Sequence, residues 1–131
     1  VFVNDEFVDR YFCDGYIVST PTGSTAYSLS AGGPILSPNV AAFILTSINS
    51  HSLHSRPIVV SENDEIALRI GGRGLVNLVV DGVSGARLSG GAEIRLKKSD
   101  AVVSFVRLSG HGFFNKLLTK LNKWGITSRE E

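Results

Sequence analysis

The sequence has no methionine and only one cysteine, Cys13. A single cysteine cannot close an internal disulfide, so the chain is not a disulfide-stapled secreted domain, and a reducing, cytoplasmic location is expected. Long hydrophobic runs are also missing, because every apolar stretch is far shorter than a helix that spans a bilayer. Neither positive nor negative charge dominates, since the chain has 13 basic and 12 acidic residues. We therefore expect neither a membrane nor a nucleic acid as a partner.

The composition that remains is that of a globular protein. The 131 residues are 43% hydrophobic and 19% charged, which suits one domain with a core of its own. The chain opens on Val1 to Arg10, an alternating pattern typical of a hairpin, without an initiator methionine. This beginning predicts that the sequence is a fragment of a longer protein.

Apolar residues alternate with polar ones along most of the chain, which predicts antiparallel strands. The predicted strands cover residues 16–19, 43–48, 57–60, 66–70, 75–80, 92–96 and 102–106. Gly71 to Gly74 is interpreted as a hairpin turn, and Asp81-Gly82 as a second tight turn. Residues 1–110 are therefore predicted to form an all-β domain of two packed, mostly antiparallel sheets, similar to a β-sandwich.

Two segments favour helix. Ser24 to Ala31 is predicted to form a short helix after the first strands, and Phe113 to Lys123 has apolar residues at helical spacing. The C-terminal helix, within residues 111–125, needs a partner for its apolar face. That partner is either the sheet of its own domain or another part of the protein. Residues 126–131 carry no pattern and are expected to form a frayed tail.

The segment from Cys13 to Pro34 is the main candidate for a functional site. A strand is followed by a Pro/Gly turn and by a helix that begins at Ser24 or Thr25. Hydroxyl residues surround this helix start, where backbone N–H groups without intrahelical partners suit an anion or a polar ligand group. The carboxylate of Asp14 lies at the beginning of the same strand. On local chemistry alone, a purely structural strand–turn–helix is the more common explanation.

Three other kinds of functional site are not supported by the residue types and their spacing. A phosphate-binding P-loop requires a G-x-x-x-x-G-K-[ST] pattern, which is missing. His51, His54 and Cys13 are too few and too dispersed for a zinc site. Ser24, His51 and Asp81 supply the residue types of a hydrolase triad, but no G-x-S-x-G elbow accompanies them. We therefore predict neither metal ligands nor a hydrolytic nucleophile in this chain.

Several longer motifs occur together. They are Asp14-Gly15, the block Ser19-Thr20-Pro21-Thr22-Gly23-Ser24-Thr25-Ala26-Tyr27-Ser28-Leu29-Ser30, Gly32-Gly33-Pro34, His51-Ser52-Leu53 followed by Pro57-Ile58-Val59-Val60, Asp81-Gly82, Phe114-Asn115 and Lys120-Leu121-Asn122-Lys123-Trp124. Together they resemble the C-terminal domain of NAD kinases, the family that uses ATP or polyphosphate, over nearly the whole chain. Diacylglycerol and sphingosine kinases have a similar architecture but lack the long block, so a lipid kinase is the weaker match.

The resemblance implies an NAD site around that block. The residues it implicates are Asp14, Thr25, Ala26, Tyr27, Ser28, Leu29, Ser30 and Asn49. The block would lie near the adenine end of NAD, with Ser28 and Leu29 as framework and Tyr27 as a buried aromatic. Asp14 would approach the nicotinamide end, often of an NAD held mainly by a neighbouring subunit. Asn49 falls where the family places a small residue at the pocket.

The reaction that the resemblance implies is phosphoryl transfer to the 2′-hydroxyl of the adenosine ribose of NAD. The donor would be ATP or polyphosphate, with Mg²⁺ on its phosphates. The family's key aspartate lies in a Gly-Gly-Asp-Gly motif of an N-terminal domain, shortly before an Asn-Glu pair, and neither motif occurs here. This chain would thus be inactive alone, join a dimer or tetramer, and pack its C-terminal helix on that domain. The alternative is a non-catalytic module that binds NAD or mediates oligomerisation.

Overall fold

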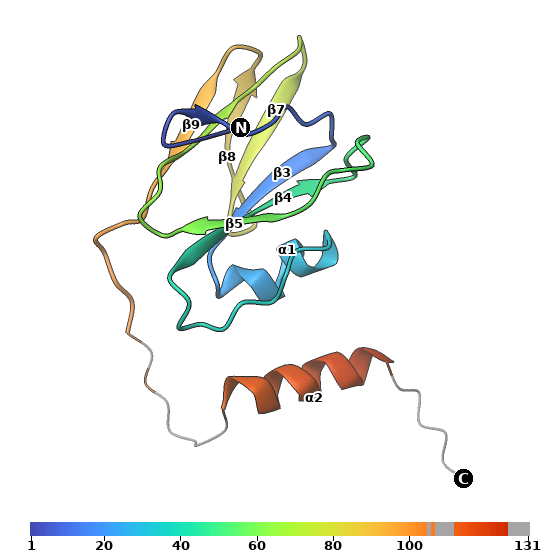
Figure 1. The fold of residues 1–131 in the computed structure, drawn as a ribbon, viewed down its shortest axis with the longest axis vertical. Coiled ribbons are helices and arrows are strands. Elements are labelled where there is room, and N and C mark those ends of the chain that lie inside the picture. Colours follow the sequence, from blue (N-terminus) through green and yellow to red (C-terminus); the bar gives the residue numbers. More distant parts are fainter. Residues whose placement is uncertain (105, 107–111, 126–131) are drawn as a thin grey trace.

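Antiparallel strands dominate the computed structural model, which describes residues 1–104, 106 and 112–125 (Figure 1). Every strand pair among the described residues is antiparallel, and a helix follows near the C-terminus, so the predicted all-β class with a C-terminal helix is confirmed. The described strands form three sheets of four, three and two strands, and not the two sheets that were predicted. Among the described residues, no helix has the length and apolar character needed to cross a membrane.

The four-stranded sheet joins the N-terminal hairpin to later strands. Its order is β2-β1-β6-β9, with β1 Phe2–Val3, β2 Glu6–Phe7, β6 Ile66–Arg69 and β9 Glu93–Leu96. Asn4 and Asp5 form the hairpin turn with φ of 50° and 63°, the left-handed conformation that two-residue hairpin loops favour. The expected N-terminal hairpin is therefore present. On β6 and β9, Arg69 pairs with Glu93 at 2.6 Å across the two strands.

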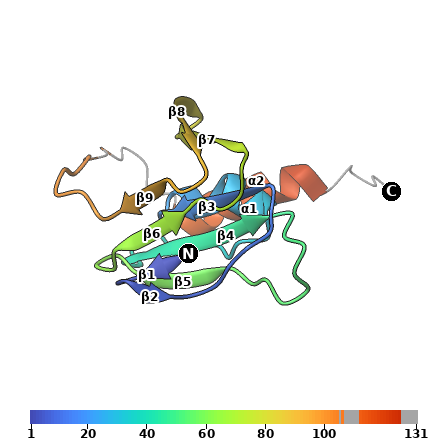
Figure 2. The same cartoon turned by 90° about the horizontal axis from the view of Figure 1, so that it is seen from above.

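The three-stranded sheet contains most of the core and carries the candidate site. Its order is β3-β4-β5, with β3 Gly15–Ser19, β4 Ala42–Ile48 and β5 Ile58–Ser61. The central strand is the most buried, since Ile44, Leu45 and Thr46 are at most 1% exposed. Segments 43–48 and 57–60, both predicted as strands, pair with each other as β4 and β5. Figure 2 shows β3, β4 and β5 lying side by side as one layer.

The two-stranded sheet stands apart from the others. It consists of β7 Leu75–Val80 and β8 Val83–Ser89, joined by the predicted Asp81-Gly82 turn with φ of 49° and 81°. The hairpin predicted at Gly71 to Gly74 is wrong, because β6 pairs with β1 and β9 and not with β7. Alternation in the sequence indicated the strands correctly, but the assumption that neighbouring strands pair was not met here.

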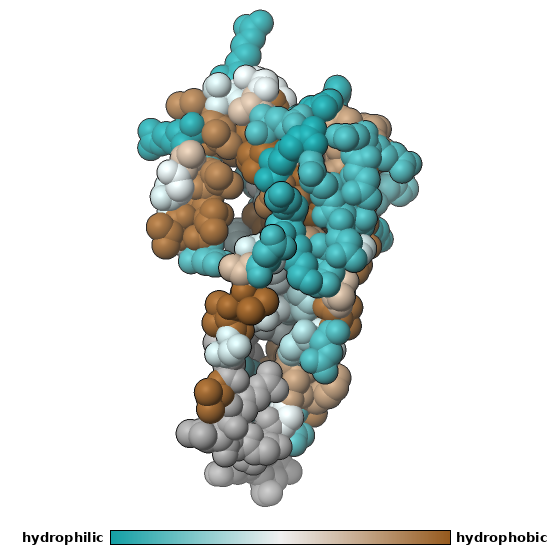
Figure 3. All heavy atoms as spheres, turned by 90° about the vertical axis from the view of Figure 1, so that its left-hand side faces the viewer, coloured by the Kyte–Doolittle hydropathy of each residue, from teal (hydrophilic) through white to brown (hydrophobic). Residues whose placement is uncertain are grey.

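The strand predicted over residues 102–106 is also wrong for the residues that are described. Residues 101–104 and 106 form no strand, and Val102, Val103 and Val106 are 85%, 79% and 87% exposed. A strand requires a partner for its backbone hydrogen bonds, and β9, the preceding strand in the chain, pairs with β6. Hydrophobic side chains consequently form open patches on the face shown in Figure 3.

The helices differ in how well they match the prediction. The single helix predicted from Ser24 to Ala31 is instead a 3₁₀ turn, η1 Gly23–Thr25, and one α-helical turn, α1 Tyr27–Ser30. Ala26 separates them, because its φ of −104° and ψ of −131° are not helical. The C-terminal helix is confirmed as α2 Phe113–Gly125. The predicted tail, 126–131, lies outside the described residues.

Candidate functional site

The turn after β3 is held in shape by one buried hydroxyl. Ser24 is fully buried, and its Oγ donates to the Pro21 carbonyl at 2.6 Å while it accepts from the Leu36 N–H at 3.0 Å. The same side chain thus joins the turn to the segment that leads into β4. Just before it, the buried Ser19 Oγ has no hydrogen-bond partner within the described part of the chain.

Replacement of Ser24 by alanine is expected to lower the free energy of unfolding by about 1–3 kcal/mol, because it leaves the partly buried Leu36 N–H without its partner. Urea unfolding of the intact protein measures this loss. Ser50→Ala, outside the turn, is the control and should change stability little. Equal stability of the wild type and the Ser24→Ala variant would contradict the structural role assigned to Ser24.

Beyond this turn, the predicted NAD-binding residues divide into exposed and buried ones. Thr25, Ala26, Tyr27 and Ser30 are exposed, whereas Ser28 is only 1% exposed. The Ser28 and Thr46 hydroxyls share a hydrogen bond of 3.2 Å, which ties α1 to the central strand. This burial agrees with the framework role predicted for Ser28. Tyr27 is 62% exposed, so its prediction as a buried aromatic is wrong.

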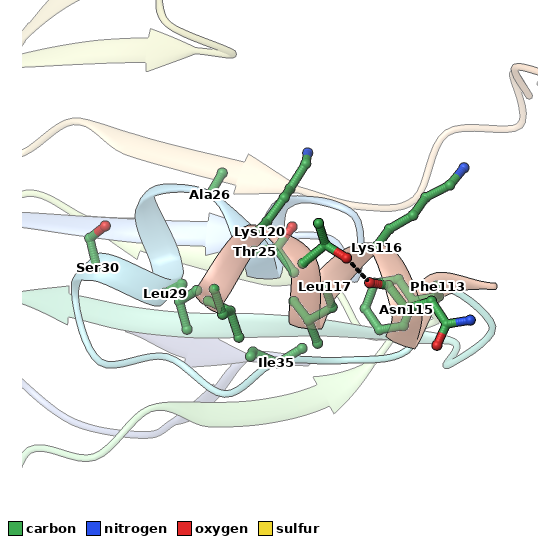
Figure 4. A pocket seen from close by; sticks show the side chains of 12 residues that line it. Thr25, Ala26, Leu29, Ser30, Ile35, Phe113, Asn115, Lys116, Leu117 and Lys120 are labelled. Carbon is green, nitrogen blue, oxygen red and sulfur yellow. Dashed lines mark hydrogen bonds between the residues drawn. The ribbon is translucent and has the colours of Figure 1, made fainter. Parts of the chain in front are cut away.

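A cleft of about 1300 Å³ lies between the η1–α1 segment and α2 (Figure 4). Four of the predicted residues, Thr25, Ala26, Leu29 and Ser30, line one side of it. The other side comes from α2, whose lining residues include Phe113, Lys116, Leu117, Lys120 and Leu121. The cleft therefore combines an apolar surface with hydroxyl groups and two lysines, which suits a ligand with a flat ring and phosphate groups.

Asp14 and Asn49 meet at the opposite end of β3. The Asn49 amide donates to the Asp14 carboxylate at 3.0 Å. Asp14 also lines a second, larger cavity of about 2160 Å³ between β3 and the β7–β8 hairpin, together with Asp81 and Tyr27. The structure thus brings together the two predicted residues that are most distant in sequence, and it separates them from the Thr25–Ser30 group by the length of β3.

The groups beside Asp14 are held neutral. Burial raises the pKa of the Cys13 thiol above its usual range. Burial, and then the neighbouring Tyr11, raises the pKa of the Tyr16 phenol far above its usual range. Tyr11 and Tyr16 pack with ring centroids 5.0 Å apart.

The alternative sites have no support in the geometry. Ser24 Oγ is committed to backbone groups and is not available as a nucleophile. Within residues 1–104, 106 and 112–125, no three His, Cys, Asp or Glu side chains converge as a metal site would require. Sequence reasoning did not find Ile35, Lys116 and Lys120, which line the α1–α2 cleft. The sequence did indicate that both lysines lie off the apolar stripe of the predicted helix. Their proximity to α1, however, depends on how the chain folds in three dimensions, which the sequence pattern does not show.

These features define a class: an antiparallel β domain with a hydroxyl-rich ligand-binding segment between its first long strand and a short helix. The model of the ATP-NAD kinase C-terminal domain matches residues 1–108, and the chain belongs to this family. It is 41% identical over 128 residues to the NAD kinase of Christiangramia forsetii, covering 98% of this chain and 43% of that protein. It is 47% identical over 117 residues to the bifunctional NADP phosphatase/NAD kinase of Methanocaldococcus jannaschii, covering 89% of this chain and 20% of that protein.

Solved structures agree with this assignment. Yeast NADH kinase complexed with NADH superimposes with a TM-score of 0.69 at 46% identity, over 72% of this chain and 27% of that one. An NAD kinase from Archaeoglobus fulgidus in complex with ATP gives a TM-score of 0.65 at 38% identity, over 76% of this chain and 38% of that one. The chain spans less than half the length of these relatives.

Proposed function

We propose that this chain is the NAD-binding, C-terminal part of an NAD kinase that phosphorylates the 2′-hydroxyl of the adenosine ribose of NAD. The donor is ATP or polyphosphate, and the enzyme acts in the cytoplasm, where the free Cys13 stays reduced. The observation that carries the proposal is the Ser19–Ser30 segment. It presents Thr25, Ala26 and Ser30 to an open cleft while Ser24 and Ser28 anchor it from beneath.

This chain does the binding and orienting in the proposed reaction. Thr25 and Ser30 offer hydroxyl groups, and Lys116 and Lys120 offer positive charge, on the same cleft. Positioning of the acceptor contributes much of the rate of phosphoryl transfer. No cluster of three His, Cys, Asp or Glu side chains forms among the described residues. Because Mg²⁺ is usually held by substrate phosphates together with one or two carboxylates, we assign it to the donor phosphates, and the catalytic Gly-Gly-Asp-Gly aspartate to a part of the enzyme outside this chain.

We also propose that the working form is a homo-oligomer, a dimer or a tetramer. Asp14 lies at one end of β3 and lines the second cavity, whereas Thr25 and Ser30 lie beyond its other end and line the α1–α2 cleft, which favours an NAD that one subunit holds and another completes.

The C-terminal helix is proposed to pack on the remainder of the enzyme. One side of α2 faces the cleft through Phe113 and Leu117. Phe114 and Leu118 nevertheless remain 65% and 56% exposed. Exposed apolar residues in such a row are typical of a surface that another part of the protein covers. This supports the second of the two expectations for the helix, a partner in another part of the protein.

The test compares the intact protein with the 131-residue chain alone. With NAD, ATP and Mg²⁺, the intact protein is expected to form NADP, and the chain alone is expected to show no turnover above background. An intact protein that binds NAD saturably without forming NADP would be a non-catalytic binding module instead. Failure of the intact protein to bind any nucleotide would contradict the proposal altogether.

Replacement of Asp14 by alanine is expected to raise the KM for NAD in the intact protein with little change in stability, because the exposed carboxylate contributes little to packing. Steady-state kinetics and thermal unfolding measure the two effects. Asp100→Ala, an exposed carboxylate outside both cavities, is the matched control. Unchanged NAD kinetics, or an unfolded variant, would mean that the role assigned to Asp14 is wrong.

A further inference from the structure

A neutral side chain holds the Asp14 carboxylate in place. Asn49 Nδ2 donates to Asp14 Oδ2 at 3.0 Å, although the residues are 35 positions apart. Asp14 comes directly before Gly15, and Asn49 comes directly after Ile48, the cross-strand partner of Gly15. The two residues therefore face each other just beyond the paired ends of β3 and β4. None of the ion pairs among the described residues includes Asp14. The carboxylate is thus oriented by an amide, and no cation among the described residues forms an ion pair with it.

The backbone around this pair is fixed by hydrogen bonds that continue the β3–β4 ladder. The Asp14 N–H donates to the Ile48 carbonyl at 3.0 Å, and the His51 N–H donates to the Phe12 carbonyl at 2.9 Å. Between these bonds Asn49 has φ 47°, a left-handed conformation that asparagine adopts more readily than most residues. Asparagine therefore meets two demands at position 49, since it accepts this backbone and supplies the donor to Asp14.

The two residues differ in their access to the neighbouring space. Asp14 lines the 2160 Å³ cavity beside β3, and Asn49 is not among the described residues that line it. A ligand in this cavity would meet the carboxylate and not the amide. This placement distinguishes an indirect role of Asn49 from the direct NAD contact that the sequence predicted.

We propose that Asn49 is a positioning residue, which holds the Asp14 carboxylate so that its charge meets a cationic ring. The inference rests on the proposed function, in which that ring is the oxidised nicotinamide of NAD. A charged group that is already oriented attracts its partner without the cost of reorganisation. The uncharged dihydronicotinamide of NADH gains less from the same carboxylate. Asn49 therefore acts on the affinity for the oxidised cofactor, and it acts through Asp14.

The test is a double-mutant cycle in the intact protein with Asn49→Gly, Asp14→Ala and the double variant. Glycine keeps the left-handed backbone accessible, so only the amide is lost. Asn49→Gly is expected to raise the KM for NAD about threefold to tenfold, less than the loss of a direct hydrogen bond to a charged group would, because the amide acts on NAD only through Asp14. The kcat should stay nearly unchanged, and the KM for NADH should rise less. In the Asp14→Ala background, Asn49→Gly should have no further effect.

The outcomes separate this inference from the proposed function. If Asn49→Gly raises the KM for NAD by the same factor in the wild-type and in the Asp14→Ala background, Asn49 contacts NAD itself, and the positioning role is wrong. If Asp14→Ala raises the KM but Asn49→Gly does not, the positioning role fails while the NAD site stands. If Asp14→Ala leaves the KM unchanged, the proposed function fails at this end of the site. Asn63→Gly, at an exposed turn away from the site, controls for the loss of an asparagine, and thermal unfolding confirms that each variant is folded.

Discussion

Replacement of Gly33 by alanine is expected to destabilise the domain by about 3 kcal/mol or more, at the upper end of overpacking effects. A Cβ atom at this position would lie 2.4 Å from Ser28 Oγ, 2.8 Å from the Ser28 carbonyl oxygen and 3.1 Å from Thr46 Oγ1. The Gly33 N–H also donates to that carbonyl at 2.8 Å. The clash therefore falls on the contact that ties α1 to β4, and either the helical turn or the hydrogen bond between Ser28 and Thr46 must yield.

The measurement is the midpoint and slope of urea unfolding for the intact protein. Gly74→Ala is the matched control, because a Cβ there would have no neighbour within 4 Å, and it is expected to change stability little. Because α1 carries Leu29 and Ser30 on the cleft, the folded fraction of the Gly33→Ala variant should also have a raised KM for NAD. A variant as stable as the wild type would mean that α1 does not approach β4 as closely as the structure has it.

The sequence was informative about this part of the fold for a physical reason. A strand, a Pro/Gly turn and small hydroxyl residues up to Ser30 are local features, and local chemistry largely determines them. The break at Ala26 was not predictable, because the hydrogen bond between Ser28 and Thr46 and the close approach of Gly33 decide where the helix begins. These are contacts between segments that are distant in sequence.

The errors elsewhere have the same origin. The alternation in 66–70 and 75–80 indicated strands correctly, but it carried no information about their partners. The actual partners of β6 are β1 and β9. Likewise, the proximity of Asn49 to Asp14 depends on the register of β3 and β4. From the sequence, the two residues were assigned to one site only through the resemblance to a family. The lysines of the cleft depend on where α2 lies, which composition and periodicity do not specify.

Replacement of Tyr27 by alanine is expected to produce the largest loss of NAD use among the variants considered. Tyr27 is 62% exposed at the beginning of α1, beside Ala26, which lines both cavities. An exposed aromatic ring that itself lines the second cavity is suited to stack on a ring of the dinucleotide. Stacking of a base on an aromatic side chain is worth about 1–3 kcal/mol, so the KM for NAD should rise by roughly 5-fold to 150-fold.

Exposure also makes this variant a clean test, since the protein loses little packing when the side chain is removed. A buried tyrosine would cost about 3 kcal/mol or more on truncation, and an effect on NAD kinetics would then be confounded with unfolding. Tyr27→Phe keeps the ring and should retain most of the affinity. Leu53→Ala, 90% exposed outside both cavities, controls for loss of an exposed apolar side chain. A Tyr27→Ala variant that is folded and has an unchanged KM would mean that the dinucleotide does not stack on Tyr27. A variant that unfolds would mean that Tyr27 is buried by another part of the protein and supports the fold instead of the ligand.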